Sequence, residues 1–313
     1  MNQTTIKQSV SCSGVGLHSG KLVKLTLYPA AEDTGIVFDI HGAKGVHRVE
    51  PSPQAAVGTG LATTLGVPGA SAATVEHLLA ALRGLEVDNI IVEIEGGEAP
   101  IMDGSAASFA LLIRNAGLVR QSAPRRVARI ARPATYEQDG KWIKAKPYNG
   151  LRIKYTIDFA HPLIGVQTFD LEITPATFMD EVAKARTFGF LREVEYLRQN
   201  NLALGGSLDN AVVLDDYAVL NEDGLRFPDE FVRHKMLDFI GDMALLGMPL
   251  QGSFEIYCSG HAVNNAFLRM LDENREYYLE EVELGETAPY APAQRPAREA
   301  TAARMLAGVS VPA

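Results

Sequence analysis

The residues with the clearest capacity for chemistry are His234, Asp238 and Asp242, spaced at i, i+4 and i+8 within FVRHKMLDFIGDMALLG (231–247). At about 100° per residue, this spacing places all three on one stripe of a helix. Most of the remaining circumference is apolar, so the helix is predicted to be buried on most sides. Because an isolated buried carboxylate is costly, the stripe is expected to face a partner, a metal or a wet cleft. His234 and Asp238, one turn apart, are predicted to form half of a divalent-metal site.

The alternative interpretation is a solvated face, which is the commoner role for a histidine and two aspartates on a helix. An ordinary surface helix, however, has a polar face about half the circumference wide. Here only Lys235 joins the stripe, and Arg233 lies elsewhere on the helix. This narrow polar seam favours a functional site.

Composition excludes several classes of protein. With 313 residues, 47% of them hydrophobic, the chain is predicted to be globular and to form two domains. A formal charge of −9 argues against nucleic-acid binding. The two cysteines, Cys12 and Cys258, have no C-x-x-C spacing and fit a reducing compartment, so we expect a cytoplasmic protein. No run approaches the roughly 18 apolar residues that span a bilayer, so no stable membrane insertion is expected.

The order of predicted elements indicates an α+β fold. Strands are predicted at 21–28, 36–40, 89–96, 141–148 and 151–159, and helices at 74–85, 105–117 and 231–247. The stretch 119–134 concentrates Arg and Pro without a clean period, and we place a domain boundary near residue 126. The domains are thus 1–126 and 127–285, followed by a loosely held Pro/Ala-rich tail at 286–313. Residues 187–216 are predicted to form a β-α-β insertion in the second domain.

The helix at 74–85 carries a second candidate half-site, Glu76-His77. His77 lies about 160° from the centre of the helix's apolar stripe, so an ordinary exposed histidine is the main alternative. Ala80, Ala81 and Gly84 share its side of the helix, however, and such small residues suit a closely covered surface. An acid beside a metal-binding histidine can accept a proton while remaining outside the ligand shell.

Together, His77, His234 and Asp238 would supply two imidazoles and one carboxylate, leaving one position of a tetrahedral zinc open for water. Non-haem iron oxygenases use the same ligand set, and the ligands alone do not separate the two. Glu76 favours hydrolysis. A non-catalytic sensor of a sugar nucleotide or acyl ligand is the alternative from another functional class.

Several longer motifs extend this pattern over most of the chain. They are GVGLHSG (14–20), TVEHLLAAL (74–82), PIMDGSA (100–106), KARTFGF (184–190), LGGSLDNAVV (204–213), NEDGLRFPDEFVRHKMLDFIGD (221–242) and SGHAVNN (259–265). In this order they resemble the zinc-dependent UDP-3-O-acyl-N-acetylglucosamine deacetylases of Gram-negative lipid A biosynthesis. The resemblance is weak after residue 285 and at 41–58.

The resemblance implies two α+β domains, each a sheet layered against helices, with the active site at their interface. It implies that one Zn²⁺ is bound by His77, His234 and Asp238, and that the acetamide of a UDP-linked 3-O-acyl sugar is hydrolysed in the committed step of lipid A biosynthesis. The implied catalytic residues are the general base Glu76, the acid His261, Asp242 holding His261, Thr187 at the oxyanion, and Lys235. We expect a monomer with no nucleic-acid partner.

Substrate contacts are also implied by the resemblance. The insertion should hold the acyl chain, and apolar residues that suit this role are Phe190, Leu191, Val194, Leu197, Leu202 and Val213. The alternative for each of them is a small local core. Phe188 matches a family active-site position and is also an implied substrate contact. Lys141 is an implied nucleotide contact, and His18 is a candidate substrate contact for which a structural hydrogen bond is the alternative. Cys258 stands where the family often has a basic residue near the diphosphate, which is a departure from the pattern.

Overall fold

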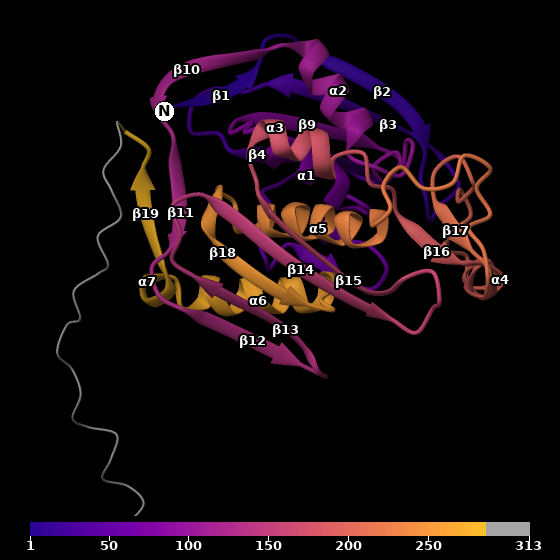
Figure 1. Cartoon of the computed structure of the whole chain (residues 1–313). Coiled ribbons are helices and arrows are strands. Elements are labelled where there is room, and N and C mark those ends of the chain that lie inside the picture. The colour runs from indigo at the N-terminus through magenta and orange to yellow at the C-terminus, as the bar shows by residue number, and fades with distance from the viewer. Residues whose placement is uncertain (286–313) are drawn as a thin grey trace, which may run out of the picture.

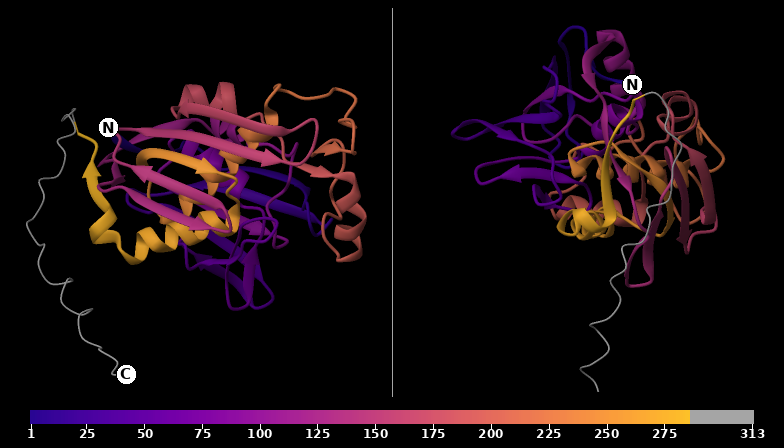
Figure 2. Two further views of the ribbon diagram at one scale, coloured as in Figure 1. Left: turned by 60° about the horizontal axis from the view of Figure 1, so that its bottom comes forward. Right: turned by 90° about the vertical axis from the view of Figure 1, so that its left-hand side faces the viewer.

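The computed structural model describes residues 1–285, so the predicted tail at 286–313 lies outside the described residues. Two large sheets face each other with helices between them (Figures 1 and 2), which confirms the predicted α+β class. Within residues 1–285, no helix is long and apolar enough to cross a bilayer.

The first sheet has five strands whose inward side chains are apolar. In order across the sheet they are β2 (Val10–Val15), β3 (Leu22–Pro29), β9 (Ile90–Glu95), β4 (Ile36–Gly42) and β5 (Gly45–Val49). Buried and less buried positions alternate along β9, as expected for a strand with one face in a core. Only the β4–β9 pairing is parallel among these neighbours.

Two helices and two smaller sheets complete the first part of the chain. The helices are α1 (Glu76–Gly84) and α2 (Ala107–Ala116). The small sheets contain β6 (Ala56–Gly58), β7 (Thr64–Val67) and β8 (Ala70–Ala72) in one, and β1 (Asn2–Ile6) and β10 (Leu118–Pro124) in the other.

The second large sheet has seven strands. They are β11 (Arg126–Ile130), β12 (Ala134–Gln138), β13 (Lys141–Lys146), β14 (Leu151–Phe159), β15 (Gly165–Glu172), β18 (Leu250–Tyr257) and β19 (Leu279–Glu283). β18 pairs with β13, β14 and β11 and so ties the sheet together.

The inner face of this sheet packs on α5 (Glu230–Met243) and α6 (His261–Glu273). Edge-to-face and tilted ring contacts join Phe239 of α5 to Tyr155 and Phe254, and Phe254 to Phe267 of α6. α5 continues as a 3-10 turn at Ala244–Leu246, and Gly247, with φ 83°, ends it. Shorter elements follow the sheets, namely α3 (Pro175–Thr177), a π-helical turn (Phe178–Val182) and α7 (Arg275–Tyr278).

The predicted β-α-β insertion is confirmed. It consists of β16 (Phe188–Phe190), α4 (Leu191–Gln199) and β17 (Val212–Leu214), and the two strands pair in parallel. In Figure 1 it forms the edge of the molecule farthest from the N-terminus.

The stretch 119–134, in which the sequence shows no clean period, forms two strands. β10 and β11 occupy most of it and are separated only by Arg125. β10 exposes most of its side chains, so it has no strong apolar alternation to reveal it. Because β10 pairs with β1 and β11 joins the second large sheet, we propose the domain boundary at Arg125, next to the predicted residue 126.

α1 and α5 pack directly against each other at the centre of the molecule (Figure 1). Gly241 makes this contact so close that a Cβ there would lie 2.1 Å from the carbonyl oxygen of Glu76. The predicted base on α1 is therefore held against the polar stripe of α5.

Candidate metal centre and active site

His77, His234 and Asp238 converge at the contact between α1 and α5. Asp238 Oδ1 lies 3.6 Å from His77 Nε2 and 3.3 Å from His234 Nε2. One ligand atom from each of the three residues lies within 4.8 Å of the other two. All three side chains are buried, so the alternative of an exposed His77 is wrong. α5 covers the side of α1 that carries His77.

The protonation states suit a metal site. His234 Nδ1 donates to the carbonyl of Ala185 at 3.1 Å, which leaves the Nε2 lone pair directed at Asp238. Burial lowers the pKa of His234 to about 3, so the ring is neutral near pH 7. Burial alone would raise the pKa of Asp238, but His234 and Lys235 bring it well below its usual value. The neutral ring of His234, the ring of His77 and the carboxylate of Asp238 therefore meet at one point.

Unsatisfied atoms support the fit to a cation. Asp238 Oδ1 is buried and makes no hydrogen bond within residues 1–285, and His77 Nδ1 is in the same state. A buried carboxylate oxygen without a donor is costly. A divalent ion placed between Asp238 Oδ1 and the two Nε2 atoms would remove that cost with the donor set typical of zinc.

Glu76 precedes His77 and is also buried. Its Oε2 accepts the main-chain N–H of Thr63 at 3.0 Å, and its Oε1 lies 3.9 Å from His261 Nε2. Burial raises the pKa of Glu76, although His261 and His77 oppose the shift. A carboxylate with a raised pKa is a stronger base.

His261 forms a buried pair with Asp242. His261 Nδ1 donates to Asp242 Oδ2 at 2.8 Å. Burial lowers the pKa of His261, but Asp242, Glu76 and Asp238 outweigh it and raise this pKa to about 10. His261 therefore carries a proton at neutral pH, and its Nε2 faces Glu76.

Lys235 borders this group, and Thr187 lies two residues after Ala185, whose carbonyl contacts His234. Lys235 Nζ donates to Asp238 Oδ2 at 2.9 Å and lies 5.5 Å from the ring centroid of Phe188. Burial alone would lower the pKa of Lys235, but the negative charge of Asp238 outweighs burial and raises this pKa above its usual value. The ammonium is therefore retained. The main chain of Thr187 bonds Gly104 and Val212, and its hydroxyl makes no hydrogen bond to the described chain.

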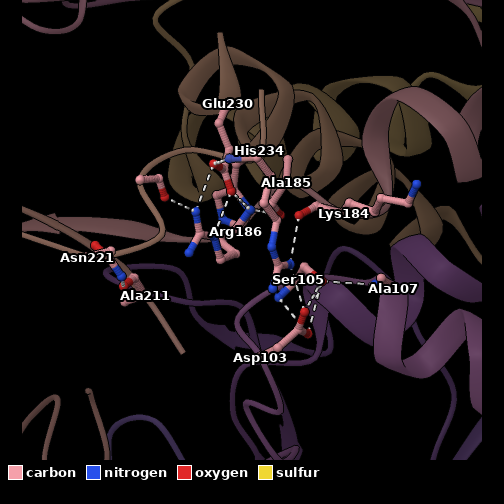
Figure 3. A network of polar contacts seen from close by, with 12 residues as sticks. Asp103, Ser105, Ala107, Lys184, Ala185, Arg186, Ala211, Asn221, Glu230 and His234 are labelled. Atoms are coloured by element: carbon pink, nitrogen blue, oxygen red, sulfur yellow. Dashed lines mark hydrogen bonds and ion pairs between the residues drawn. The ribbon is translucent and has the colours of Figure 1, made fainter. Parts of the chain in front are cut away.

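A buried ion pair that the sequence did not reveal supports the metal ligands (Figure 3). Arg186 donates through Nε and its main-chain N–H to Glu230 Oε1, both at 2.9 Å. Arg186 follows Ala185, whose carbonyl orients His234. Glu230 is fully buried at the start of α5. No spacing in the sequence links residue 186 with residue 230, so only the fold brings the pair together.

A second arm of the same network crosses to the first domain. Arg226 donates to Asp103 at 2.8 Å and to the carbonyl of Lys184 at 3.0 Å. Asp103 also accepts the hydroxyl hydrogens of Ser105 and Ser108 (Figure 3 shows Asp103 and Ser105). Arg226 thereby links Lys184, which precedes Ala185, to Asp103 of the first domain.

The residues predicted for the acyl chain lie in the insertion. The ring of Phe188 lies 5.0 Å from Phe231 and 6.4 Å from His234, and Phe190 packs on Phe159 at 6.1 Å. The other members are less enclosed: Leu191 is 46% exposed, and Val194, Leu197, Leu202 and Val213 are half-buried. No residue of α4 is buried, so these side chains do not form a closed local core.

His18 and Lys141 lie outside the metal cluster. The main-chain N–H of His18 donates to Glu98 at 2.8 Å, whereas its two buried ring nitrogens have no partner in the described chain. The alternative of a structural hydrogen bond therefore involves the His18 main chain and not its ring. Lys141 lies exposed at the start of β13. Burial raises the pKa of the Cys258 thiol, and the nearby ammonium of Lys141 lowers it in part.

A cavity of about 770 Å³ lies elsewhere, beside the C-terminal half of α5. Its lining includes Arg83, Arg125, Phe239 and Met243, and none of the predicted site residues. The chemistry-bearing residues therefore do not coincide with this hollow.

The Arg186–Glu230 pair makes a prediction about stability. Glu230→Gln keeps the side-chain shape but leaves the buried guanidinium without its counter-charge, which should cost about 3–5 kcal/mol of unfolding free energy in urea denaturation. Asp170→Asn is the matched control, because Asp170 makes a similar two-bond contact with Arg152 on the exposed sheet face. That control should cost less than about 1 kcal/mol. Equal losses in the two variants would contradict the structural role of Glu230.

Comparison with known proteins identifies the family of the chain. The family model "UDP-3-O-acyl N-acetylglycosamine deacetylase" matches residues 3–273. The chain is 69% identical to the UDP-3-O-acyl-N-acetylglucosamine deacetylase of Nitratidesulfovibrio vulgaris, over 95% of this chain and 96% of that protein. It is 68% identical to the protein of that name from Oleidesulfovibrio alaskensis (92% and 94% covered), and 48% identical to that of Haemophilus influenzae (88% and 92%). The chain belongs to the UDP-3-O-acyl-N-acetylglucosamine deacetylase family.

Proposed function

We propose that the chain binds one Zn²⁺ through His77, His234 and Asp238 and hydrolyses the acetamide of UDP-3-O-(3-hydroxyacyl)-N-acetylglucosamine. The products are the free amine and acetate, in the committed step of lipid A biosynthesis. One observation supports the proposal above all. The three candidate ligands lie beside a buried base, Glu76, and a protonated histidine, His261. A sensor would have no use for the base and the acid.

When bound, zinc would lower the pKa of a coordinated water and polarise the acetamide carbonyl. Glu76 is proposed to take a proton from the attacking water as the C–O bond forms. Thr187, whose hydroxyl is free to donate, is proposed to stabilise the oxyanion. Lys235 keeps a positive charge beside Asp238.

His261 is proposed to supply the proton that the leaving nitrogen needs. Its Nδ1–H is committed to Asp242, so the proton at Nε2 is the one available for transfer. As the C–N bond breaks, that proton moves to nitrogen and the amine departs. The proton taken by Glu76 and the proton given by His261 balance the hydrolysis.

The insertion is proposed to hold the acyl chain along Phe188, Phe190, Leu191, Val194 and Leu202. Each methylene removed from water there would contribute about 0.8 kcal/mol. Support comes from Phe188, which lies beside both His234 and Lys235 and so connects the insertion to the site. Lys141 is proposed as a contact of the nucleotide, and His18 as a contact of the substrate.

The proposal is tested by acetate release from UDP-3-O-acyl-N-acetylglucosamine substrates of several chain lengths, with and without a chelator. Turnover should stop with the chelator, return with Zn²⁺, and fall as the acyl chain is shortened. Binding without turnover would indicate a sensor. A requirement for iron and oxygen would indicate an oxygenase.

Glu76→Ala provides the internal control of that experiment. It should retain zinc but lose roughly a hundredfold or more in kcat, because it lacks the base but keeps the ligands. Near-normal turnover in this variant would contradict the assignment of Glu76.

The pH profile of kcat/KM should be bell-shaped, falling on the acid side as Glu76 is protonated and on the alkaline side as His261 loses its proton. Asp242 raises the pKa of His261. In Asp242→Asn that negative charge is gone, so the alkaline limb should move to lower pH. A limb that stays in place would exclude His261 as its source.

A further inference from the structure

Asp242 accepts hydrogen bonds from three side chains. Its Oδ2 accepts from His261 Nδ1 at 2.8 Å and from Asn264 Nδ2 at 2.7 Å. Its Oδ1 accepts from the hydroxyl of Thr63 at 2.6 Å. Asn264 is itself fixed, because its Oδ1 accepts the hydroxyl hydrogen of Ser259 at 2.6 Å.

Thr63 comes from the first domain, in the segment between β6 and β7, and is 1% exposed. Its main-chain N–H donates to Glu76 Oε2 at 3.0 Å, and its carbonyl accepts from Val75 at 3.3 Å. One residue thus contacts the base through its main chain and the partner of the acid through its side chain.

The direction of the hydroxyl follows from the chemistry of its neighbours. An ionised carboxylate only accepts, so the single hydroxyl proton of Thr63 goes to Asp242 Oδ1. The 3.4 Å separation from His261 Nδ1 is too long to compete. His261 Nδ1–H therefore remains directed at Oδ2 of a carboxylate whose plane is fixed at both oxygens.

We propose that Thr63 is a positioning residue for the deacetylation step, which orients Asp242 from the opposite domain and thereby aligns His261 as the acid. The proposal rests on the proposed function. Asn264 does the same from α6, through the other carboxylate oxygen. Thr63 also links the domain interface to catalysis. It helps to hold the base Glu76 and the acid His261 at their separation while it contacts both Glu76 and Asp242.

The hydroxyl also tunes how tightly His261 holds its proton. The charged groups that face His261 are Asp242 and Asp238 on α5 and Glu76 on α1. A donor on Asp242 Oδ1 stabilises the carboxylate charge and so weakens its attraction for the imidazolium. Without the donor, Oδ1 is a buried acceptor with no partner, and His261 becomes a weaker acid.

The test compares Thr63→Val, which removes only the hydroxyl, with Thr63→Ser, which retains it. Thr63→Val should lower kcat about tenfold to a hundredfold, with KM and bound zinc nearly unchanged. The alkaline limb of kcat/KM should move to higher pH, opposite to its movement in Asp242→Asn. Thr63→Ser should restore both the rate and the limb.

Thr64→Val is the matched control, since the neighbouring hydroxyl makes no hydrogen bond within residues 1–285 and its removal should leave kcat and the limb unchanged. If Thr63→Val does not fold, Asn264→Ala removes the donor on the other oxygen and should shift the limb the same way. Normal kcat in Thr63→Val, or a loss with an unmoved limb that serine does not repair, would overturn the proposal. Absence of metal-dependent acetate release from the unmodified protein would instead refute the proposed function.

Discussion

The close contact between α1 and α5 is the constraint on which the site depends. At Gly241 the helix backbones approach so closely that a side chain of any size would strike the carbonyl of Glu76. This contact brings Glu76 and His77 from one domain onto the polar stripe of the other. A larger residue at 241 would force the helices apart and separate His77 from His234 and Asp238.

The site also depends on how its buried carboxylates are compensated. Glu76, Asp238 and Asp242 are three carboxylates in a nearly dry interface, and such groups are tolerated only when paired or bound to a cation. Asp242 has His261, Thr63 and Asn264, and Asp238 Oδ2 has Lys235. Asp238 Oδ1 has no donor in the described chain, and this is the atom around which the histidine nitrogens gather. The uncompensated negative charge is thus confined to Asp238 Oδ1, and it favours a divalent cation at this point.

The sequence predicted those parts of the site that follow from helical period. The stripe of His234, Asp238 and Asp242 could be recognised because 3.6 residues per turn relates positions four and eight apart. The β-α-β insertion had an equally local signature.

His77 was ambiguous because its environment is set by α5, more than 150 residues away in sequence. Thr63, Asn264 and the Arg186–Glu230 pair could not be found, since a lone threonine or asparagine has no pattern and ion pairs between distant segments leave no spacing. β10 and β11 were missed because mostly exposed or fully buried strands do not alternate.

The proposed chemistry depends on one metal ion held by two imidazoles and one carboxylate drawn from both domains. X-ray absorption at the zinc edge of the loaded protein tests it most directly, together with the zinc content of His77→Ala. We expect one zinc per chain, a shell of nitrogen and oxygen ligands including two imidazoles, no sulfur, and loss of tight binding when His77 is removed. A sulfur ligand from Cys12 or Cys258, or an unchanged spectrum and zinc content in His77→Ala, would contradict it.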